Sequence, residues 1–452
     1  MEAEKADMGK QKAEMTVGGK ARNTNYRQGS NHRRRSVQTT PGQHCGLKSA
    51  LQAPFSHFLK HECHLCIEPE PSCQHAQKLR DAVFTNRWLS RREPLNLKLE
   101  TGFQTGLACP PMTRWLTGLY LLCLPMMAAD GLWKPLPSLP DAEGFAGAFA
   151  GVADGALLVA GGTNFPDKKP WEGGTKLWYD KVYALKEPSG KWQIAGRLPK
   201  PNGYGVSLTT ESGLICIGGG DASANFREVI RIRFKGGKLM TEPLPALPRA
   251  CALMAGAKLG QVIYIAGGIE KPADTVALTN FLALDLERLN EGWKPLPACP
   301  GSARILPTMA AVDGAVYLFS GAALKPGPDG KAAREWLKDA WRYSPEAGWK
   351  RLADLPRVSV AAPSPAPVRG GRMLLMGGDD GALVHFEPKD RHPGFPREVL
   401  AYDWKQDVWA RDGEVPFSLV TTPAVEWHGA IVIPGGEARP GKRSPEVWWR
   451  TY

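Results

Sequence analysis

Histidine and cysteine are scarce in most of this chain of 452 residues. Nine of each are present, but only three histidines and three cysteines follow residue 129. His385, His392 and His428 are too few well-placed ligands for the copper centre of a radical oxidase. Cys216 lies in an apolar segment, where a buried free thiol is expected, and three thiols do not indicate a disulfide framework in so large a core. We therefore expect neither a metal nor a cofactor.

Several catalytic motifs are also absent. The sequence has no Ser-His-Asp motif, no glycine-rich phosphate loop and none of the Asp-box repeats of sialidases. A glycosidase would need a pair of carboxylates on either side of the scissile bond. Hydrolysis by these routes is therefore not predicted.

Positive charge is concentrated at the N-terminal end. Residues 1–111 hold 17 lysines and arginines against 10 aspartates and glutamates, whereas the other 341 residues hold 40 and 35. More than half of the net charge of +12 thus lies in about a quarter of the chain, and it indicates no nucleic-acid partner for the rest. We interpret residues 1–111 as an upstream segment translated in error or, alternatively, as a disordered extension.

One group of cysteines and histidines in this extension has partial zinc-ligand spacing. Cys63 and Cys66 are separated as in zinc sites. The next pair, Cys73 and His75, follows after only six residues and lacks the usual ligand spacing. No zinc site is therefore expected.

A signal-peptide pattern begins at Met112. Residues 112–114 are short and positive, residues 115–127 are apolar, and Ala128-Ala129 supplies small residues before a cleavage site at Asp130. The apolar run is too short for a membrane span. Residues 112–129 are therefore predicted to direct export to the periplasm, with no membrane anchor after cleavage. Because a signal peptide does not function behind 111 polar residues, Met112 is the preferred start.

Two short signals alternate six times along the remaining chain. The first is an apolar run that ends in two small residues, and successive pairs are 49 to 58 residues apart. These pairs are Gly161-Gly162, Gly218-Gly219, Gly267-Gly268, Ser320-Gly321, Gly377-Gly378 and Gly435-Gly436. The second is a tryptophan followed by a Leu-Pro turn, at Trp133, Trp192, Trp293, Trp349 and Trp409, with residues 238–248 in the remaining place. Such a period predicts an all-β, six-bladed, kelch-type β-propeller over residues 130–452.

One repeat predicts the four strands of one blade. In the first repeat, residues 144–152, 156–160 and 181–185 are expected as strands, and Trp192 marks the fourth. The glycine pair permits positive φ and the close approach of two backbones. The tryptophan ring is large enough to fill the space between blades, which widens outward.

The two ends of the propeller sequence are incomplete in a complementary way. The chain stops at Tyr452, after the third strand of the sixth blade, and it begins with an unpaired fourth-strand sequence at residues 132–137. Pairing these ends would remove two exposed sheet edges. The N-terminal strand is therefore predicted to join the last blade and close the ring.

One face of the propeller is expected to carry the functional site. The loop after each second strand and the link to the next blade share a face, and on this face the loops are long. These loops are residues 163–180, 269–279, 322–338, 379–397 and 437–445. Their polar residues include Asn164, Glu172, Asp379, Asp380, His385, Glu437 and Arg443, and the links add Tyr204, Arg249, Arg304 and Arg357. Several arginines at one channel mouth indicate an anionic ligand.

The segment from Ile433 to Arg443 resembles a family motif. It reads IPGGEARPGKR, and it is similar to the Gly-Glu-Ala-Lys-Pro-Gly-x-Arg motif of the N-acetylneuraminate epimerases, or sialic acid mutarotases. Residues 144–147 and 204–208 also match segments of that family. Residues 164–166 and 170–174 resemble its cyclically permuted branch, in which the glutamate-bearing blade comes last. The resemblance covers residues 131–452.

The resemblance implies a catalytic assignment. Glu437 corresponds to the proposed acid/base residue and Arg443 to the functional arginine, which would hold the sugar carboxylate bidentately. Asn164, Tyr204 and Arg249 are expected to bind the substrate with Arg443. The implied reaction interconverts the α and β anomers of N-acetylneuraminate, or of a related small sugar acid, by acid/base ring opening without a cofactor. The alternative is a non-catalytic propeller that binds a protein or a glycan.

Overall fold

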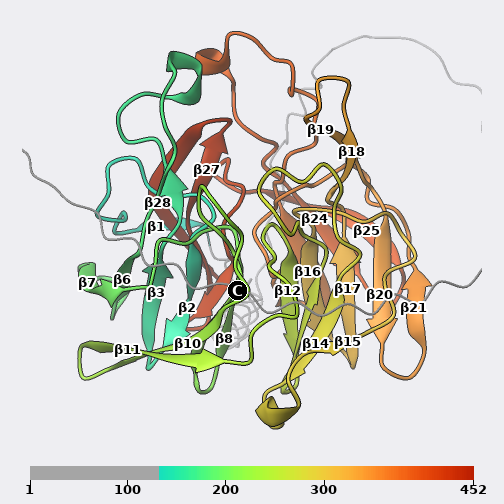
Figure 1. Ribbon diagram of the computed structural model, residues 1–452, viewed down its shortest axis with the longest axis horizontal. Helices are drawn as coiled ribbons and strands as arrows, with labels where there is room; N and C mark the ends of the chain where they lie inside the picture. The colour runs from blue at the N-terminus through green and yellow to red at the C-terminus, as the bar shows by residue number, and fades with distance from the viewer. Residues whose placement is uncertain (1–131) are drawn as a thin grey trace, which may run out of the picture. The chain divides into compact units, whose positions relative to one another are not determined.

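Six four-stranded antiparallel sheets make up residues 132–452, the part of the chain that this computed structural model describes (Figure 1). They are the blades of a six-bladed β-propeller, as the repeats predicted. The extension, the Cys63–Cys66 group and the signal peptide predicted within residues 1–131 lie outside the described residues. None of the helices in residues 132–452 has the length and apolar composition needed to cross a membrane.

The first three blades follow one another along the chain. Blade 1 comprises β2 (Phe149–Ala153), β3 (Ala156–Ala160), β6 (Lys181–Leu185) and β7 (Gln193–Arg197). Blade 2 comprises β8 (Val206–Thr210), β9 (Gly213–Ile217), β10 (Val229–Lys235) and β11 (Lys238–Leu244). Blade 3 comprises β12 (Ala255–Leu259), β13 (Val262–Ala266), β14 (Phe281–Asp285) and β15 (Lys294–Pro295).

The last three blades complete the ring. Blade 4 comprises β16 (Thr308–Val312), β17 (Ala315–Phe319), β20 (Ala340–Ser344) and β21 (Gly348–Arg351). Blade 5 comprises β22 (Val368–Arg369), β23 (Arg372–Met376), β24 (Glu398–Asp403) and β25 (Val408–Glu414). Blade 6 comprises β26 (Val425–Trp427), β27 (Ala430–Arg439), β28 (Lys442–Thr451) and β1 (Lys134–Leu136).

The N-terminal strand closes the propeller as predicted. Strand β1 is antiparallel to β28, with Lys134 opposite Trp449 and Leu136 opposite Val447. Trp133 packs edge-on against Phe417, with 5.1 Å between ring centroids. Closure therefore joins the two ends of the described chain within one sheet and leaves β28 with a partner on both sides.

The small-residue pairs adopt the backbone that the sequence predicted. Gly161 and Gly162 have φ of 65° and 89°, and a Cβ on Gly161 would lie 2.3 Å from the carbonyl oxygen of Asn202. The degenerate pair Ser320-Gly321 has the same conformation, with φ of 54° and 103°. The Ser320 hydroxyl donates to the carbonyl of Leu337 and accepts from the N–H of Ser359. These hydrogen bonds hold Ser320 where the other blades have glycine.

Four tryptophans link neighbouring blades in the same way. The indole N–H of Trp293 in blade 3 donates to the carbonyl of Pro245, which follows β11 of blade 2, at 2.8 Å. Trp192 donates to Pro137, Trp349 to Pro297 and Trp409 to Ala353, each in the link that follows the preceding blade. The tryptophan and Leu-Pro signals of the sequence are thus the two sides of one contact between blades.

A closed ring of backbone hydrogen bonds joins the six links that lead into the blades. In each link, a residue with positive φ donates its N–H to the carbonyl of the equivalent residue in the previous link at 2.7–2.9 Å. The six ring residues are Gly147, Tyr204, Leu253, Leu306, Ala361 and Thr421. Gly147 donates to Thr421, which closes the circle. Because Gly147 bends here, β2 begins at Phe149 and not at Gly144 as the sequence predicted.

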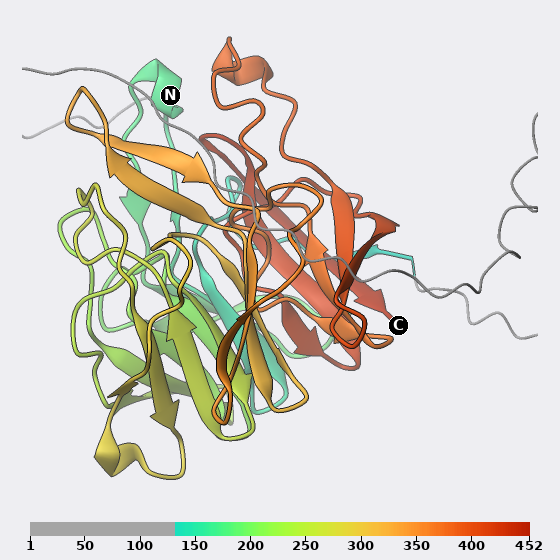
Figure 2. The ribbon, with the colours of Figure 1, turned by 90° about the vertical axis from the view of Figure 1, so that its right-hand side faces the viewer.

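The long connections lie on one face, at the upper side of Figure 1 and again at the top of Figure 2. They contain two extra hairpins, β4 (Thr163–Asn164) with β5 (Leu177–Trp178) and β18 (Ala322–Pro326) with β19 (Ala332–Trp336). They also contain the short helices η1 (Pro170–Glu172) and η3 (Lys389–Arg391), whereas η2 (Leu289–Glu291) belongs to the opposite face. The loop predicted over residues 437–445 is largely strand, because β27 and β28 continue as a hairpin beyond Gly435-Gly436.

Candidate active site

A pocket of about 400 Å³ opens at the channel mouth on the long-loop face. Loops and links from all six blades contribute to its wall, and ring residues such as Leu253, Leu306 and Thr421 form its floor. A smaller cavity of about 70 Å³ is lined by the same ring residues. Of the polar residues that the sequence placed on this face, the pocket brings together Tyr204, Asp379, Glu437 and Arg443.

Glu437 and Arg443 face each other across the hairpin of blade 6. Their Cα atoms are direct partners in the β27–β28 ladder, and Arg443 Nη1 lies 2.7 Å from Glu437 Oε1. The same oxygen accepts the N–H of Gly441 at 2.9 Å. Within residues 132–452 no hydrogen bond reaches Glu437 Oε2, and the side chain is 19% exposed. One carboxylate oxygen is therefore held by the protein while the other remains available to the pocket.

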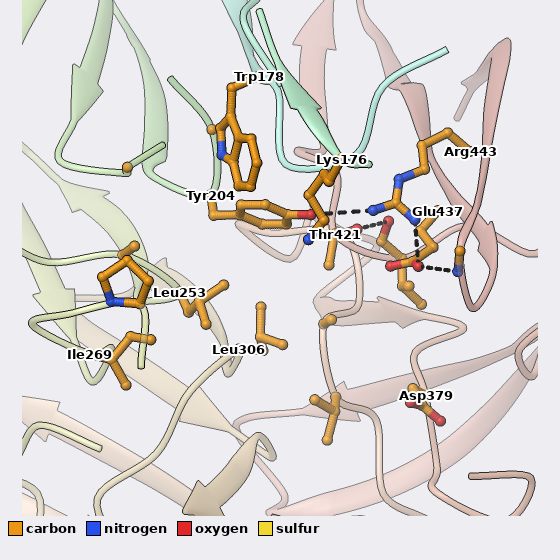
Figure 3. A pocket seen from close by; sticks show the side chains of 18 of the residues that line it. Lys176, Trp178, Tyr204, Leu253, Ile269, Leu306, Asp379, Thr421, Glu437 and Arg443 are labelled. Carbon is orange, nitrogen blue, oxygen red and sulfur yellow. Dashed lines mark hydrogen bonds and ion pairs between the residues drawn. The ribbon is translucent and has the colours of Figure 1, made fainter. Parts of the chain in front are cut away.

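Arg443 is buried although it is charged. Only 3% of its side chain is exposed, and its guanidinium lies over the ring of Phe165 at 4.9 Å from the centroid. Its second terminal nitrogen lies 3.4 Å from the hydroxyl of Tyr204 (Figure 3). The same hydroxyl lies 2.9 Å from the hydroxyl of Thr163. Both ends of the guanidinium fork thus have partners within the protein.

Lys176 brings a second positive charge to the pocket. Its ammonium nitrogen lies 5.9, 5.4 and 5.3 Å from the ring centroids of Phe165, Trp178 and Tyr204. Aromatic faces attract a cation at such distances. No carboxylate among residues 132–452 lies within ion-pairing distance of Lys176. In contrast to Arg443, Lys176 therefore has a positive charge that is not neutralised by an acidic neighbour.

Asp379 is a second carboxyl group in the pocket wall. Its Oδ1 accepts the N–H of Gly381 at 3.0 Å. Burial is the largest influence on this group, and it raises the pKa of the Asp379 carboxyl above its ordinary value. The negative charges of Asp380 and Glu437 act in the same direction, whereas Arg334 opposes them. Asp379 therefore holds its proton to higher pH than an exposed aspartate.

Two predicted substrate-binding residues lie away from this pocket. Asn164 is 1% exposed, and its amide binds Asp141, the carbonyl of Gly144 and the hydroxyl of Tyr179. Every polar atom of its side chain is therefore used in holding the loop around β4. Arg249 has 53% of its side chain exposed and pairs with Glu270 at 3.6 Å. Neither residue lines the pocket wall.

The arginines of two other links are structural. Arg304 is 2% exposed and forms a two-pronged contact with Asp339, at 2.7 and 2.6 Å. Arg357 binds Glu398 and the carbonyl of Gly377. Both guanidinium groups cross to neighbouring strands inside the blades, so they do not converge on the channel mouth as the sequence suggested.

Other polar loop residues make local contacts or face solvent. Glu172 accepts the N–H of Lys169, and Asp380 accepts the N–H of Ala382. His385 is exposed. Residues 132–452 contain no group of three or more histidine, cysteine or acidic residues placed to hold a metal ion.

Sequence reasoning missed Phe165, Lys176, Trp178 and Arg334, which also line the pocket. They belong to the two loops that contain extra hairpins, and these hairpins do not recur in the other blades. A signal was nevertheless present, because Lys176 and Trp178 are two residues apart and side chains at that spacing share one side of a strand.

Comparison with known proteins agrees with this architecture. A family model described as N-acetylneuraminate epimerase matches residues 126–241 and 244–387, which together exceed half of the chain. The chain belongs to the N-acetylneuraminate epimerase family. The matched residues of this family member end before Glu437, so the match does not include the β27–β28 hairpin.

Curated relatives of this family member share part of its length. The N-acetylneuraminate epimerase of Haemophilus influenzae (strain 86-028NP) is 38% identical over 228 residues, which are 45% of this chain and 58% of the relative. That of Yersinia pestis (strain Pestoides F) is 38% identical over 128 residues, 24% of this chain and 32% of the relative. The chain thus spans between about a third and three fifths of these relatives.

A solved structure has the same fold. The structure of YjhT superimposes with a TM-score of 0.53 and 15% sequence identity, and the alignment covers 70% of this chain and 97% of that chain. At this identity the likeness supports the propeller fold alone.

Proposed function

We propose that this chain is an epimerase that interconverts the α and β anomers of N-acetylneuraminate or a related sugar acid. The observation that supports this most is the Glu437–Arg443 pair, which lies in a pocket at the channel mouth. A carboxylate with one oxygen anchored and the other free suits repeated proton transfer. Membership of the N-acetylneuraminate epimerase family supports the substrate class.

Glu437 would act as the base that begins the reaction. Ring opening removes the proton of the anomeric hydroxyl, forms a carbonyl there and delivers a proton to the ring oxygen. Ring closure on the other face of the carbonyl reverses these transfers and gives the second anomer. Glu437 Oε2 is the free acceptor for the first proton, and the Arg443 guanidinium holds the other carboxylate oxygen in place.

Lys176 is our candidate for the group that binds the sugar carboxylate. Arg443 is already committed to Glu437 and Tyr204, whereas the Lys176 ammonium has aromatic neighbours and no acidic partner among residues 132–452. A ligand carboxylate beside Lys176 would supply the missing negative charge. Tyr204, Trp178 and Phe165 would pack against the sugar beside it.

Anomer equilibration followed by proton NMR tests this function. N-acetylneuraminate supplied as one anomer should reach equilibrium faster with the protein than in buffer alone. If the protein does not exceed the spontaneous rate, the epimerase proposal fails. The alternative of a non-catalytic binding platform then applies, although such a platform has no need of the Glu437–Arg443 pair.

We also propose that the protein is exported to the periplasm, on the basis of the sequence at residues 112–129. Sequencing the N-terminus of the protein recovered from a periplasmic extract should give Asp130 as its first residue. A mature chain that retains residues 1–111 would contradict both the signal peptide and the start at Met112.

A further inference from the structure

We propose that Asp379 is the second proton-transfer residue of this site, protonating the ring oxygen while Glu437 takes the proton of the anomeric hydroxyl. This assignment rests on the proposed function and deepens it, because it gives the reaction a separate acid and base. It is carried by the positions of the two side chains in the propeller.

Asp379 and Glu437 occupy the same position in adjacent blades. Each is the first residue after its glycine pair, and each forms a bridge with the residue just before a member of the hydrogen-bonded ring. Asp379 pairs with Val360, which precedes Ala361, and Glu437 pairs with Val420, which precedes Thr421. Both line the same pocket. The repeat thus brings two carboxyl groups to the channel mouth, one blade apart.

The surroundings of these two carboxyl groups differ in the way that an acid and base pair requires. Glu437 has the Arg443 guanidinium at 2.7 Å, which stabilises the carboxylate. Asp379 has no ion pair among residues 132–452, and its single hydrogen bond comes from the N–H of Gly381. The contrast in partners therefore favours Asp379 as the acid and Glu437 as the base.

Among the residues that the structure describes, four charged or titratable groups surround Asp379: Arg334, Asp380, Glu437 and His392. Arg334 on β19 is the nearby cation, and it lowers the pKa of the aspartate. Asp380 and Glu437 raise it, together with the dominant effect of burial. His392 is buried in the same loop, and burial lowers its pKa, so it remains neutral at neutral pH. Together these influences raise the pKa of the Asp379 carboxyl. This direction agrees with the absence of an ion pair at Asp379 within residues 132–452.

The proposed step balances without any further reactant. The bond between the anomeric carbon and the ring oxygen breaks as the anomeric hydroxyl loses its proton to Glu437. The ring oxygen takes the proton of Asp379, which leaves Glu437 protonated and Asp379 ionised. Ring closure on the opposite face returns the hydroxyl proton to Asp379 and the Glu437 proton to the new anomeric oxygen. Both carboxyl groups end in their starting states.

The variant Asp379→Asn separates a catalytic from a structural role. Asparagine keeps the oxygen that accepts the N–H of Gly381, but it has no proton to transfer at any relevant pH. We expect kcat to fall by about 10²–10⁴-fold with little change in KM, the range typical of general acid–base catalysis. Asp380→Asn is the comparison variant, since Asp380 makes the equivalent contact with Ala382 but does not line this pocket. It should keep most of kcat, and loss of the Asp380 charge should move the fall in rate to lower pH.

The pH dependence of the rate distinguishes a catalytic from a structural role, because a purely structural residue would not change it. Asp379 acts as an acid only while it is protonated, so the wild-type rate should fall as pH rises through its raised pKa. Asp379→Asn should lose this alkaline limb, and Asp379→Glu should restore part of the rate. All rates are compared with the spontaneous rate at the same pH.

Failure of the proposed function and failure of the Asp379 assignment give different results. If the wild-type protein does not exceed the spontaneous rate, the proposed function itself is wrong. If the wild type is active and Asp379→Asn equals it in kcat and pH profile, the epimerase proposal survives and Asp379 is not the acid. A folded Asp379→Asn protein that loses activity but keeps the alkaline limb also overturns the assignment.

Discussion

Arg443 carries its positive charge in a place that water scarcely reaches, with 3% of its side chain exposed. A buried charge is tolerated only where an opposite charge and hydrogen bonds replace its hydration. Glu437 and Tyr204 provide these contacts. Each member of the Glu437–Arg443 pair therefore depends on the other to offset the cost of burying its charge.

Replacing Glu437 by glutamine tests the proposed base. Glutamine keeps the shape and an oxygen that can accept from Arg443, but it cannot take up a proton. We expect kcat to fall by about 10²–10⁴-fold. Arg443 would face a neutral partner, so the free energy of unfolding should fall by about 1–3 kcal/mol in a urea titration. Equal activity of the variant and the wild type by NMR would refute the assignment of Glu437.

Comparing Arg443→Lys with Lys176→Met shows which of the two positively charged side chains binds the sugar carboxylate. A lysine at 443 cannot reach both Glu437 and Tyr204, so we expect kcat to fall more than KM rises. Lys176→Met keeps most of the apolar stem and removes the charge, so KM should rise by about 10–100-fold, the loss of a charge-assisted hydrogen bond. The sugar amide, which lacks the carboxylate, is the control for Lys176→Met. The reverse pattern would show that Arg443 binds the carboxylate.

At the scale of elements, neighbouring blades are fastened by tryptophan rings at their outer strands. The ring of Trp293 is 8% exposed, and its N–H binds the carbonyl of Pro245 in the link after blade 2. Blade 2 has no tryptophan in its own outer strand β11, where Met240 is 47% exposed. The contact that Trp293 makes therefore has no counterpart at Met240 of blade 2.

Trp293→Phe should weaken the contact between blades 2 and 3. Phenylalanine keeps much of the apolar area but removes the indole N–H and leaves the Pro245 carbonyl without this donor. We expect a loss of about 1–2 kcal/mol in the free energy of unfolding, with an unchanged dependence on urea. Met240→Ala is the control and should remain within about 0.5 kcal/mol of the wild type. Equal losses of unfolding free energy in Trp293→Phe and Met240→Ala would show that the tryptophan contact does not stabilise the propeller specifically.

The elements that repeat are those that the sequence predicted best. Blade number, the strands 156–160 and 181–185, and the positive φ at Gly161-Gly162 agree with the structure, because the propeller imposes the same backbone six times. The ends of elements were less well predicted. Residues 437–445 were predicted as the loop after the sixth glycine pair, whereas two β-bulges let the strands continue through this segment.

Side-chain direction limited the prediction of the site. Glu437 and Arg443 were identified from a motif, and the antiparallel register explains why six residues separate two side chains that touch. Arg304 and Asn164 are residue types that are equally common in binding sites, but their polar atoms form hydrogen bonds inside the fold. Sequence alone does not reveal these hydrogen bonds, since their partners Asp339 and Asp141 lie 35 and 23 positions away.

At the scale of the whole molecule, the ring is closed by strand pairing and not by a covalent link between its ends. Strand β1 pairs with β28, and Pro137 accepts the N–H of Trp192 in blade 1. These few residues therefore connect blade 6 both within its own sheet and to blade 1. The blade that they complete is also the blade that carries Glu437 and Arg443.

Truncation at two places tests this closure. A chain that begins at Asp130 retains β1 and should melt at the same temperature as the full chain, because residues 1–111 are predicted to add nothing to the fold. A chain that begins at Ser138 lacks β1 and leaves one edge of β28 unpaired. We expect it to lose roughly 3–5 kcal/mol of stability and to melt roughly 5–15 °C lower. Identical melting of the two truncated chains would show that β1 is dispensable.

The six hydrogen bonds beneath the pocket all run in one sense of rotation, from each link to the one before it. The components of their peptide dipoles around the circle therefore cancel, as they do in any closed loop of equal vectors. The ring of hydrogen bonds accordingly has no net dipole in its own plane. The asymmetry that a bound sugar acid experiences must come from side chains in only a few of the blades, such as Lys176, Asp379 and Glu437. A sixfold scaffold can thus host a strictly one-sided site, and a change of substrate needs new wall residues but no new floor.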